Sequence, residues 1–205
     1  RQVSSAASDV YKRQPYGKTK LAIEEVLNDL YLSKKDTWRI AKLRYFNPVG
    51  AHNSGLLSEN PNEELGNLFP AIIRFINNPE SKLAIFGKDW PTKDGTCVRD
   101  FIHIMDLADA HLASLDLLKS NDPQNLAINI GTGLGTSILE IIKKFQEIKQ
   151  EEFPYYFSQK RAGDVPFVVA DNSKALRILN WKPKRTLTEM CRDSLLTTYS
   201  NQKTP

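Results

Sequence analysis

Short apolar runs alternate along this chain with longer segments whose apolar residues recur every three or four positions. Runs such as 40–46 and 126–130 have the length and composition of buried strands. Segments such as 18–32 and 138–148 have the period of an amphipathic helix. Strands that alternate with helices through short turns predict an α/β fold. The same patterns predict further helices at 68–76, 107–118, 173–179 and 187–198, and further strands at 82–86 and 98–104.

A tyrosine and a lysine stand four residues apart at the start of the first predicted helix, as Tyr16 and Lys20. This spacing places both groups on one helical face, one turn apart, where the ammonium can favour the phenolate form. Such a phenolate can act as general base for a sugar hydroxyl whose carbon gives hydride to a nicotinamide. The same spacing also occurs in three other pairs: Tyr31/Lys35, Tyr156/Lys160 and Tyr199/Lys203.

The surroundings of the four tyrosines distinguish these pairs. Tyr31 lies at the ragged end of a predicted helix, and Tyr156 lies in an alternating run that is typical of a strand. Tyr199 belongs to the C-terminal tail. Tyr16 opens a strongly helical segment that a buried-type strand follows, so we interpret Tyr16 and Lys20 as the candidate catalytic pair.

The composition is that of an ordinary globular protein. The 205 residues are 40% hydrophobic and 25% charged, enough for one substantial core or two small ones. The longest apolar runs are far shorter than the roughly 20 residues that span a bilayer, so we expect no membrane partner. Cys97 and Cys191 are too few and too distant for a disulfide framework, which favours a reducing cytoplasm.

Two further classes of function receive little support from the charged and metal-binding residue types. His52, His103 and His111 do not have metal-ligand spacing, so we expect packing or hydrogen-bonding roles and no metal site. The net charge is +4, but no basic cluster is interleaved with aromatic residues, so we expect no nucleic-acid partner. A modest positive field suits an anionic small molecule equally well.

The segment from Ser4 to Gln14 resembles the in-frame translation of a transposase adapter used to make sequencing libraries. We expect residues 1–14 to be such an artefact, with the native sequence beginning at Pro15 in a truncated gene fragment. The alternative is a natural Ser/Ala-rich tail.

A glycine-rich turn, Gly131 to Gly135, follows the predicted strand 126–130 and precedes a helix. It is similar to a dinucleotide-binding fingerprint, but the third glycine of that pattern would fall on Thr136. No acidic residue about twenty positions further on stands at a convincing strand end. We therefore interpret this junction as a structural strand-to-helix turn.

Several motifs follow one another in a family-specific order, namely those at 43–52, 83–87, 94–103, 105–109 and 161–166. Through them the chain resembles the UDP-glucose 4-epimerase family of extended short-chain dehydrogenases/reductases, from Pro15 to about Leu195. The resemblance implies the C-terminal part of a Rossmann-type doubly wound sheet plus a smaller α/β substrate-binding domain. The NAD-binding part would comprise 15–48 and about 124–135, and the UDP-sugar-binding part about 49–123 and 136–205.

The same resemblance implies NAD as cofactor and interconversion of UDP-glucose and UDP-galactose through transient oxidation at sugar C4. Tyr16 matches the family's base, and Lys20 matches the partner that also holds the nicotinamide ribose. The positions that match the nicotinamide side are Tyr45, Phe46 and Pro48. The positions that match UDP-sugar contacts are Asn47 and Asn67 for the UDP-sugar, Leu68, Ala84, Ile85 and Phe86 for the uridine pocket, Arg99 and Arg161 for the diphosphate, and Asp164 for the uridine ribose.

The chemistry of these residue types supports the assignment. Guanidinium groups bind diphosphate oxygens in bidentate fashion, and a carboxylate accepts hydrogen bonds from a ribose diol. Without the surrounding motifs, Arg99 and Asp100 would be read as a surface ion pair. Phe167 matches the position whose size limits room near the sugar C2 substituent, so we expect little activity on N-acetylated substrates.

Three features of the family would lie upstream of Pro15. They are the glycine-rich loop that binds the phosphates, the acidic residue that binds the adenosine ribose, and the catalytic Ser or Thr. We therefore expect this chain to be inactive as it stands. The resemblance also implies that the full-length protein is a homodimer. Two alternatives remain open. One is another NAD-dependent nucleotide-sugar enzyme of the same superfamily, such as a dehydratase or decarboxylase, and the other is a non-catalytic UDP-sugar-binding module.

Overall fold

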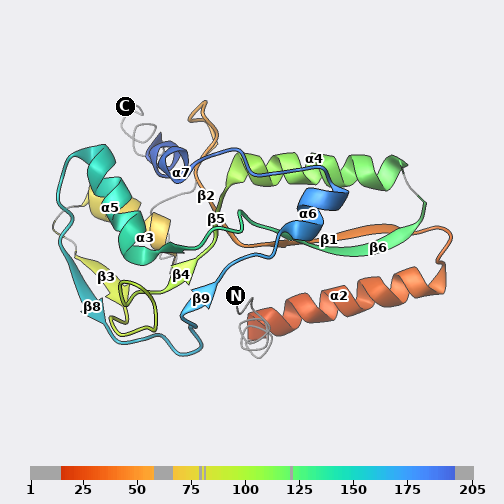
Figure 1. Ribbon diagram of the computed structural model, residues 1–205, viewed down its shortest axis with the longest axis horizontal. Coiled ribbons are helices and arrows are strands. Elements are labelled where there is room, and N and C mark those ends of the chain that lie inside the picture. The colour runs from red at the N-terminus through yellow and green to blue at the C-terminus, as the bar shows by residue number, and fades with distance from the viewer. Residues whose placement is uncertain (1–14, 58–66, 79, 81, 121, 197–205) are drawn as a thin grey trace.

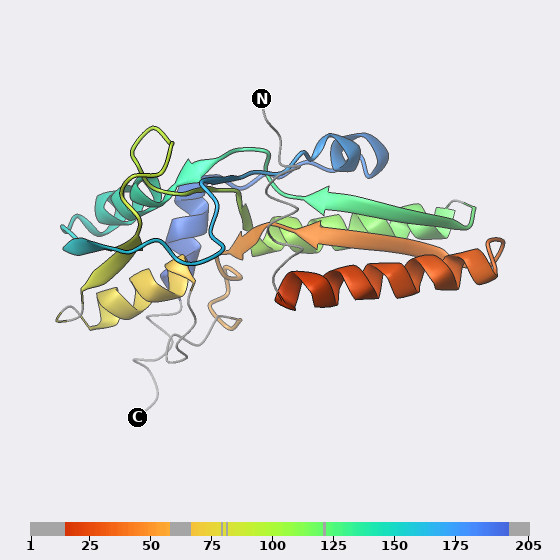
Figure 2. The same cartoon turned by 90° about the horizontal axis from the view of Figure 1, so that it is seen from below.

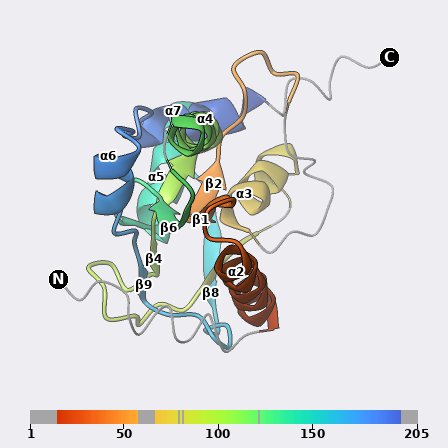
Figure 3. The same cartoon turned by 90° about the vertical axis from the view of Figure 1, so that its right-hand side faces the viewer.

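Two long parallel strands form the centre of one half of the molecule. The computed structural model describes residues 15–57, 67–78, 80, 82–120 and 122–196. Strand β1 (Arg39–Tyr45) pairs with β6 (Gln124–Ile130) along its whole length. Helices α2 (Pro15–Ser33) and α4 (Ile104–Ser120) cover opposite faces of this pair (Figures 1 and 3). A parallel sheet between helices is the Rossmann-type arrangement, which confirms the α/β prediction.

The two faces of β1 are held to their helices in different ways. On the α4 face, Leu43 packs on an apolar cluster of buried residues: Ile102, Leu107, Ala110, Ile128, Ile130, Ala175, Leu179 and Trp181. On the α2 face, Arg44 donates two hydrogen bonds to Glu24, and the Nζ of Lys42 lies 2.5 Å from the Oδ1 of Asn28. Helix α2 has no fully buried residue, so these polar contacts are an important part of its attachment to the strand.

The second half contains shorter strands and its own core. Its elements are β2 (Asn47–Val49), α3 (Leu68–Asn77), β3 (Leu83–Phe86), β4 (Val98–Arg99), β5 (Phe101–His103), β7 (Thr136–Ser137), α5 (Ile138–Lys149), β8 (Tyr155–Ser158), β9 (Phe167–Val168) and α7 (Leu187–Ser194). Helix α6 (Ser173–Ile178), which lies between β9 and α7 in the chain, packs on β6 of the first half. Strand β2 pairs with β5, β3 with β8 and β4 with β9, all in parallel, while β4 and β7 are antiparallel. Figure 2 shows this half beside the β1–β6 pair.

Helices α3, α5 and α7 enclose the core of this second half. Its buried members are Phe69, Ile72, Ile73, Phe75, Leu83, Ile85, Phe101, Ile141, Ile142, Phe145, Phe153, Met190, Cys191 and Leu195. Both α5 and α7 begin with a capping box, Ser137 with Glu140 and Thr186 with Glu189. In each box the hydroxyl and the carboxylate satisfy backbone N–H groups that have no intrahelical partner.

Residues Asn47–Val49, directly after the predicted strand 40–46, form β2, and Gly50 after them has a φ of +86°. One prediction about a strand was wrong in detail. The strand expected over 98–104 is divided into β4 and β5 at Asp100, and α4 begins at Ile104 rather than at 107. The physical reason is that β4 pairs with β9 whereas β5 pairs with β2, so the chain changes neighbours at Asp100.

The packing also bears on the proposed division of the chain. Helices α4 and α6 lie within the ranges assigned to the UDP-sugar-binding part, but α4 contacts β1 and β6, and α6 contacts β6. This packing favours counting both helices with the sheet. Residues 1–14 and Tyr199 lie outside the described residues. Within the described ranges, no helix combines the length and apolar character needed to cross a membrane.

Candidate functional site

The Tyr16/Lys20 pair lies on the first turns of α2. The Nζ of Lys20 is 5.1 Å from the centre of the Tyr16 ring, so the two side chains share one helical face as the spacing predicts. Tyr16 is 70% exposed. Helix α2 runs opposite to β1, so its first turn lies at the end of the sheet where β1 and β6 finish (Figures 1 and 2). Ligands of parallel α/β sheets bind at this carboxyl edge.

Three of the residues expected near the nicotinamide follow at the same edge. The hydroxyl of Tyr45 lies 2.7 Å from the Nε2 of His111 on α4, so its side chain is on the face opposite to α2. Phe46 donates its N–H to the carbonyl of Ile130 at 3.1 Å. The side chain of Pro48 is exposed within β2.

Residues expected to bind the diphosphate and the uridine come from β3, β4 and the loop after β8. The Cζ of Arg161 is 3.7 Å from the centre of the Phe86 ring, a cation–π contact. Arg99 is 8% exposed, and its Nη1 donates to the carbonyls of Val98 at 2.9 Å and Val165 at 2.8 Å.

The acidic residues beside this cluster are Asp164 and Asp100. Arg99 and Asp100 do not form the surface ion pair that their adjacent positions in the sequence would suggest. The Nη2 of Arg99 lies 3.6 Å from the Oδ1 of Asp164, so the structure brings these two predicted residues together. Asp100 is fully buried, and its carboxylate instead accepts hydrogen bonds from Thr132 and Gly133. Those N–H groups are therefore occupied by a carboxylate, which supports the interpretation of the glycine-rich turn as structural.

The remaining residues predicted for the uridine and sugar are at the ends of short elements. Asn67 is the N-cap residue of α3, and Leu68 packs against the second core. Ile85 is buried in that core. Strand alternation then directs Ala84 and Phe86 to the opposite face of β3. Asn47 donates its N–H to the carbonyl of Asp100 at 3.0 Å, and its side chain is exposed.

Phe167 lies on a different strand face from Arg99. The ladder between β4 and β9 pairs Val98 with Phe167 and Arg99 with Val168. Paired residues of a parallel ladder point to the same face. Phe167 therefore shares the face of Val98, toward Gly135, and Val168 shares the face of Arg99. Phe167 is 50% exposed.

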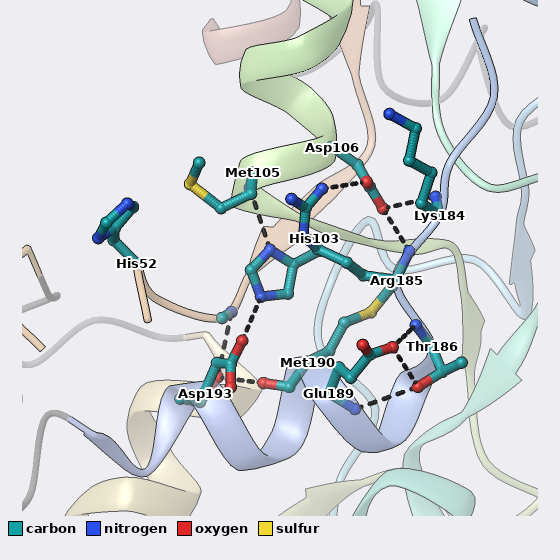
Figure 4. A network of polar contacts seen from close by, with 12 residues as sticks. His52, His103, Met105, Asp106, Lys184, Arg185, Thr186, Glu189, Met190 and Asp193 are labelled. Atoms are coloured by element: carbon teal, nitrogen blue, oxygen red, sulfur yellow. Dashed lines mark hydrogen bonds and ion pairs between the residues drawn. The ribbon is translucent and has the colours of Figure 1, made fainter. Parts of the chain in front are cut away.

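A polar network between β5, α4 and α7 is structural. Figure 4 shows His103, which accepts from the N–H of Met105 at Nδ1 and lies 3.1 Å from the Oδ2 of Asp193 at Nε2. Beside it, the buried Asp106 accepts from Arg185 and from the N–H of Lys184. These contacts tie α7 and the segment before it to β5 and α4. Among the described residues, no three His, Cys, Asp or Glu side chains gather as metal ligands do.

Fold and site together define a Rossmann-type α/β protein with a Tyr/Lys pair at the carboxyl edge of its sheet. The sequence profile of the NAD dependent epimerase/dehydratase family matches residues 2–131. This match covers more than half of the chain, and the chain belongs to that family.

Individual relatives agree with this assignment. The chain is 46% identical to a UDP-glucose 4-epimerase of Bacillus subtilis over 180 residues, which are 88% of this chain and 52% of the relative. It is 45% identical to UDP-glucose 4-epimerase 2 of Arabidopsis thaliana over 186 residues, 91% of this chain and 53% of that protein. The chain thus spans about half the length of the curated relatives it matches.

Solved structures give the same result for the fold. A UDP-glucose-4-epimerase from Stenotrophomonas maltophila, solved with bound NAD and formylated UDP-arabinopyranose, matches with a TM-score of 0.85 and 42% identity. The match covers 93% of this chain and 56% of that one. A UDP-glucose 4-epimerase from Bifidobacterium longum in complex with NAD+ and UDP matches with a TM-score of 0.85 and 39% identity, over 92% and 56% of the two chains.

Proposed function

We propose that this chain is the UDP-sugar-binding part, with the catalytic helix, of an NAD-dependent UDP-glucose 4-epimerase. The observation that carries the proposal is the combination of Tyr16 and Lys20 on one face of α2 with the Arg99, Arg161 and Asp164 cluster in the other half. The UDP-glucose 4-epimerases with which the chain shares 42–46% identity support it. The proposed substrates are UDP-glucose and UDP-galactose.

The residues of this chain suit the nicotinamide end of NAD. Lys20 would hold the nicotinamide ribose, and Tyr45, Phe46 and Pro48 would line the nicotinamide side. When bound, NAD supplies reversible hydride acceptance at sugar C4. The N–H groups of the turn after β6 are taken by Asp100, so this turn does not provide the phosphate-binding site. We infer that the rest of the cofactor site belongs to a segment that precedes Pro15.

The residues of this chain would then carry out a proton transfer and bind UDP tightly. Tyr16, as phenolate, would take the proton of the sugar 4-hydroxyl, with Lys20 stabilising the negative charge. Arg99 and Arg161 would bind the diphosphate, and Asp164 would accept from the uridine ribose. Binding energy placed on UDP leaves the hexose free to present either face to the nicotinamide. A cytoplasmic homodimer is the proposed state of the whole protein.

The test starts from the source DNA upstream of the Pro15 codon. A frame that encodes a glycine-rich strand–turn–helix and a Ser or Thr before Tyr16 supports the proposal. The completed protein should then interconvert UDP-glucose and UDP-galactose, and Tyr16→Phe should lower kcat by at least about 100-fold. Tyr31→Phe is the matched control, because Tyr31 lies on the same helix and also has a lysine four residues on.

Two outcomes would contradict the epimerase assignment. If the completed protein binds UDP without NAD and shows no turnover, it is a non-catalytic UDP-sugar-binding module. If it dehydrates or decarboxylates the nucleotide sugar, it is a different enzyme of the superfamily.

A further inference from the structure

The carboxylate of Asp100 is fully buried and is held by neutral groups. It accepts hydrogen bonds from the N–H groups of Thr132 at 2.9 Å, Gly133 at 2.9 Å and Ala170 at 3.1 Å, and from the Thr132 hydroxyl at 2.6 Å. Within the part of the chain that the structure describes, no ion pair to this carboxylate is found. Burying an uncompensated charge is costly, and several converging N–H donors offset that cost.

The backbone of Asp100 extends this connection to two more segments. Its N–H donates to the carbonyl of Val168 at 3.0 Å, and its carbonyl accepts from the N–H of Asn47 at 3.0 Å. One residue therefore joins the start of β2, the β4–β5 junction, the glycine-rich turn and the end of β9. Three of these four segments carry side chains assigned above to the UDP-sugar: Asn47, Arg99 and Phe167.

Gly131 provides the space for this arrangement. A Cβ at Gly131 would lie 2.8 Å from the Oδ2 of Asp100 and 2.6 Å from the Cβ of Ala170. The φ of Gly131 is not positive, unlike that of Gly133. Glycine is therefore required at 131 by the close approach of Asp100 and Ala170, and not by its own backbone conformation.

We propose that Asp100 is a positioning residue for UDP-sugar binding. Side chains alternate along an extended chain, so Asp100 points away from the face that Arg99 occupies. Its carboxylate fixes the turn after β6 and the segment after β9 against the β4–β5 junction, whose backbone carbonyl at Asp100 holds the N–H of Asn47, and together these contacts fix the separation of Asn47, Arg99 and β9. The inference rests on the proposed function, in which those segments contact the nucleotide sugar.

The structure offers a matched control in Asp106. Its carboxylate is also fully buried, and it accepts from the N–H groups of Lys184 at 3.1 Å and Arg185 at 3.0 Å and from the Arg185 guanidinium at 2.5 Å. It joins α4 to the segment before α7 and none of the segments that carry UDP-sugar residues. Asp→Asn at either position keeps the side-chain volume but puts an amide NH2 group opposite N–H donors.

The experiment compares Asp100→Asn with Asp106→Asn in the full 205-residue chain. UDP affinity is measured by titration calorimetry at a temperature where circular dichroism shows both variants folded. Amide hydrogen exchange without ligand is measured at Asn47, Thr132 and Ala170. Both variants lose stability, but Asp100→Asn should weaken UDP binding about tenfold or more, and Asp106→Asn less than about threefold. Asp100→Asn should also speed exchange at all three amides.

Gly131→Ala is a second variant that retains the charge and displaces the carboxylate. It should weaken UDP binding in the same direction, and it decides the question if Asp100→Asn does not fold. Equal losses of affinity in the Asp100 and Asp106 variants would overturn the inference, as would wild-type affinity in Gly131→Ala. If the unsubstituted chain binds no UDP, the proposed function fails. Amide exchange at Asn47 then decides whether Asp100 positions this segment. Unchanged exchange in Asp100→Asn refutes the positioning role, and faster exchange supports it.

Discussion

The hydroxyl of Tyr45 lies 2.7 Å from the Nε2 of His111, a contact that joins the end of β1 to α4. The Nδ1 of His111 is 2.8 Å from the carbonyl of Leu107. A carbonyl can only accept, so Nδ1 carries the hydrogen, and Nε2 accepts from the tyrosine hydroxyl. The pair fixes Tyr45 on the α4 face of β1, whereas the next residue back, Arg44, reaches Glu24 on α2.

Loss of the Tyr45 hydroxyl should destabilise the fold without weakening UDP binding. Tyr45→Phe keeps the ring but removes one hydrogen bond, so the free energy of unfolding should fall by about 1 kcal/mol in urea. A double-mutant cycle with His111→Leu should give a coupling energy of about 0.5–1.5 kcal/mol. Additive effects of the two substitutions would show that the contact contributes nothing to stability.

Arg161 should contribute far more to UDP binding than its neighbour Lys160. Both cations stack on an aromatic ring, Arg161 on Phe86 and Lys160 on Trp90, but we assign a diphosphate contact to Arg161. Arg161→Ala should weaken UDP binding at least about tenfold, because hydrogen bonds to charged groups contribute about 1.5–3 kcal/mol. Lys160→Ala, measured by the same calorimetry, should change it less than about threefold. Equal effects would indicate a general electrostatic attraction.

Selectivity against N-acetylated sugars is expected to depend on Phe167. Phe167→Ala should improve the affinity for UDP-N-acetylglucosamine relative to UDP-glucose, by about tenfold if the ring crowds the acetamido group. Val168→Ala is the informative comparison, because Val168 shares the face of Arg99. Competition against a labelled UDP ligand measures both ratios. A shift in Val168→Ala with none in Phe167→Ala would move the selectivity to the Arg99 face of β9.

Cys191 should make the fold sensitive to alkali. Burial raises the pKa of its thiol from 9.0 to about 12. Above pH 9 the unfolded chain loses this proton while the folded chain keeps it, so stability falls as pH rises between about 9 and 12. The stability difference between wild type and Cys191→Ala should therefore shrink by about 1.4 kcal/mol from pH 8 to pH 10. A constant difference in urea unfolding would contradict this.

The helices could be predicted from the sequence because their signals are local. Apolar spacing predicts α2 and α5 to within a few residues, and the Ser137/Glu140 capping box can be read as S-x-x-E before an apolar run. The break at Asp100 has no such signal. The partners of its carboxylate, Thr132 and Ala170, come from distant segments, and the local sequence around Asp100, which follows Arg99, does not reveal them.

The candidate site shows the same limit. The spacing of Tyr16 and Lys20 predicts a shared face because both lie on one helix, and the structure confirms it. The position of Phe167 relative to Arg99 depends instead on the register between two strands, which no local pattern determines. Motif matching finds residue types that bind a nucleotide sugar but not the strand faces on which they lie.

The long-range pairing of the strands has a consequence for how the molecule is made. Arg39 pairs with Gln124, Leu83 with Tyr155 and Val98 with Phe167, so each parallel ladder must wait for a partner from much later in the chain. Non-local pairing of this kind slows folding, because loop-closure entropy is lost before contacts form. During synthesis at about 5–20 residues per second, β1 would remain unpaired for several seconds after leaving the ribosome. The unpaired edge of nascent β1 can pair with other chains during this interval, so aggregation during synthesis is the expected risk of this topology.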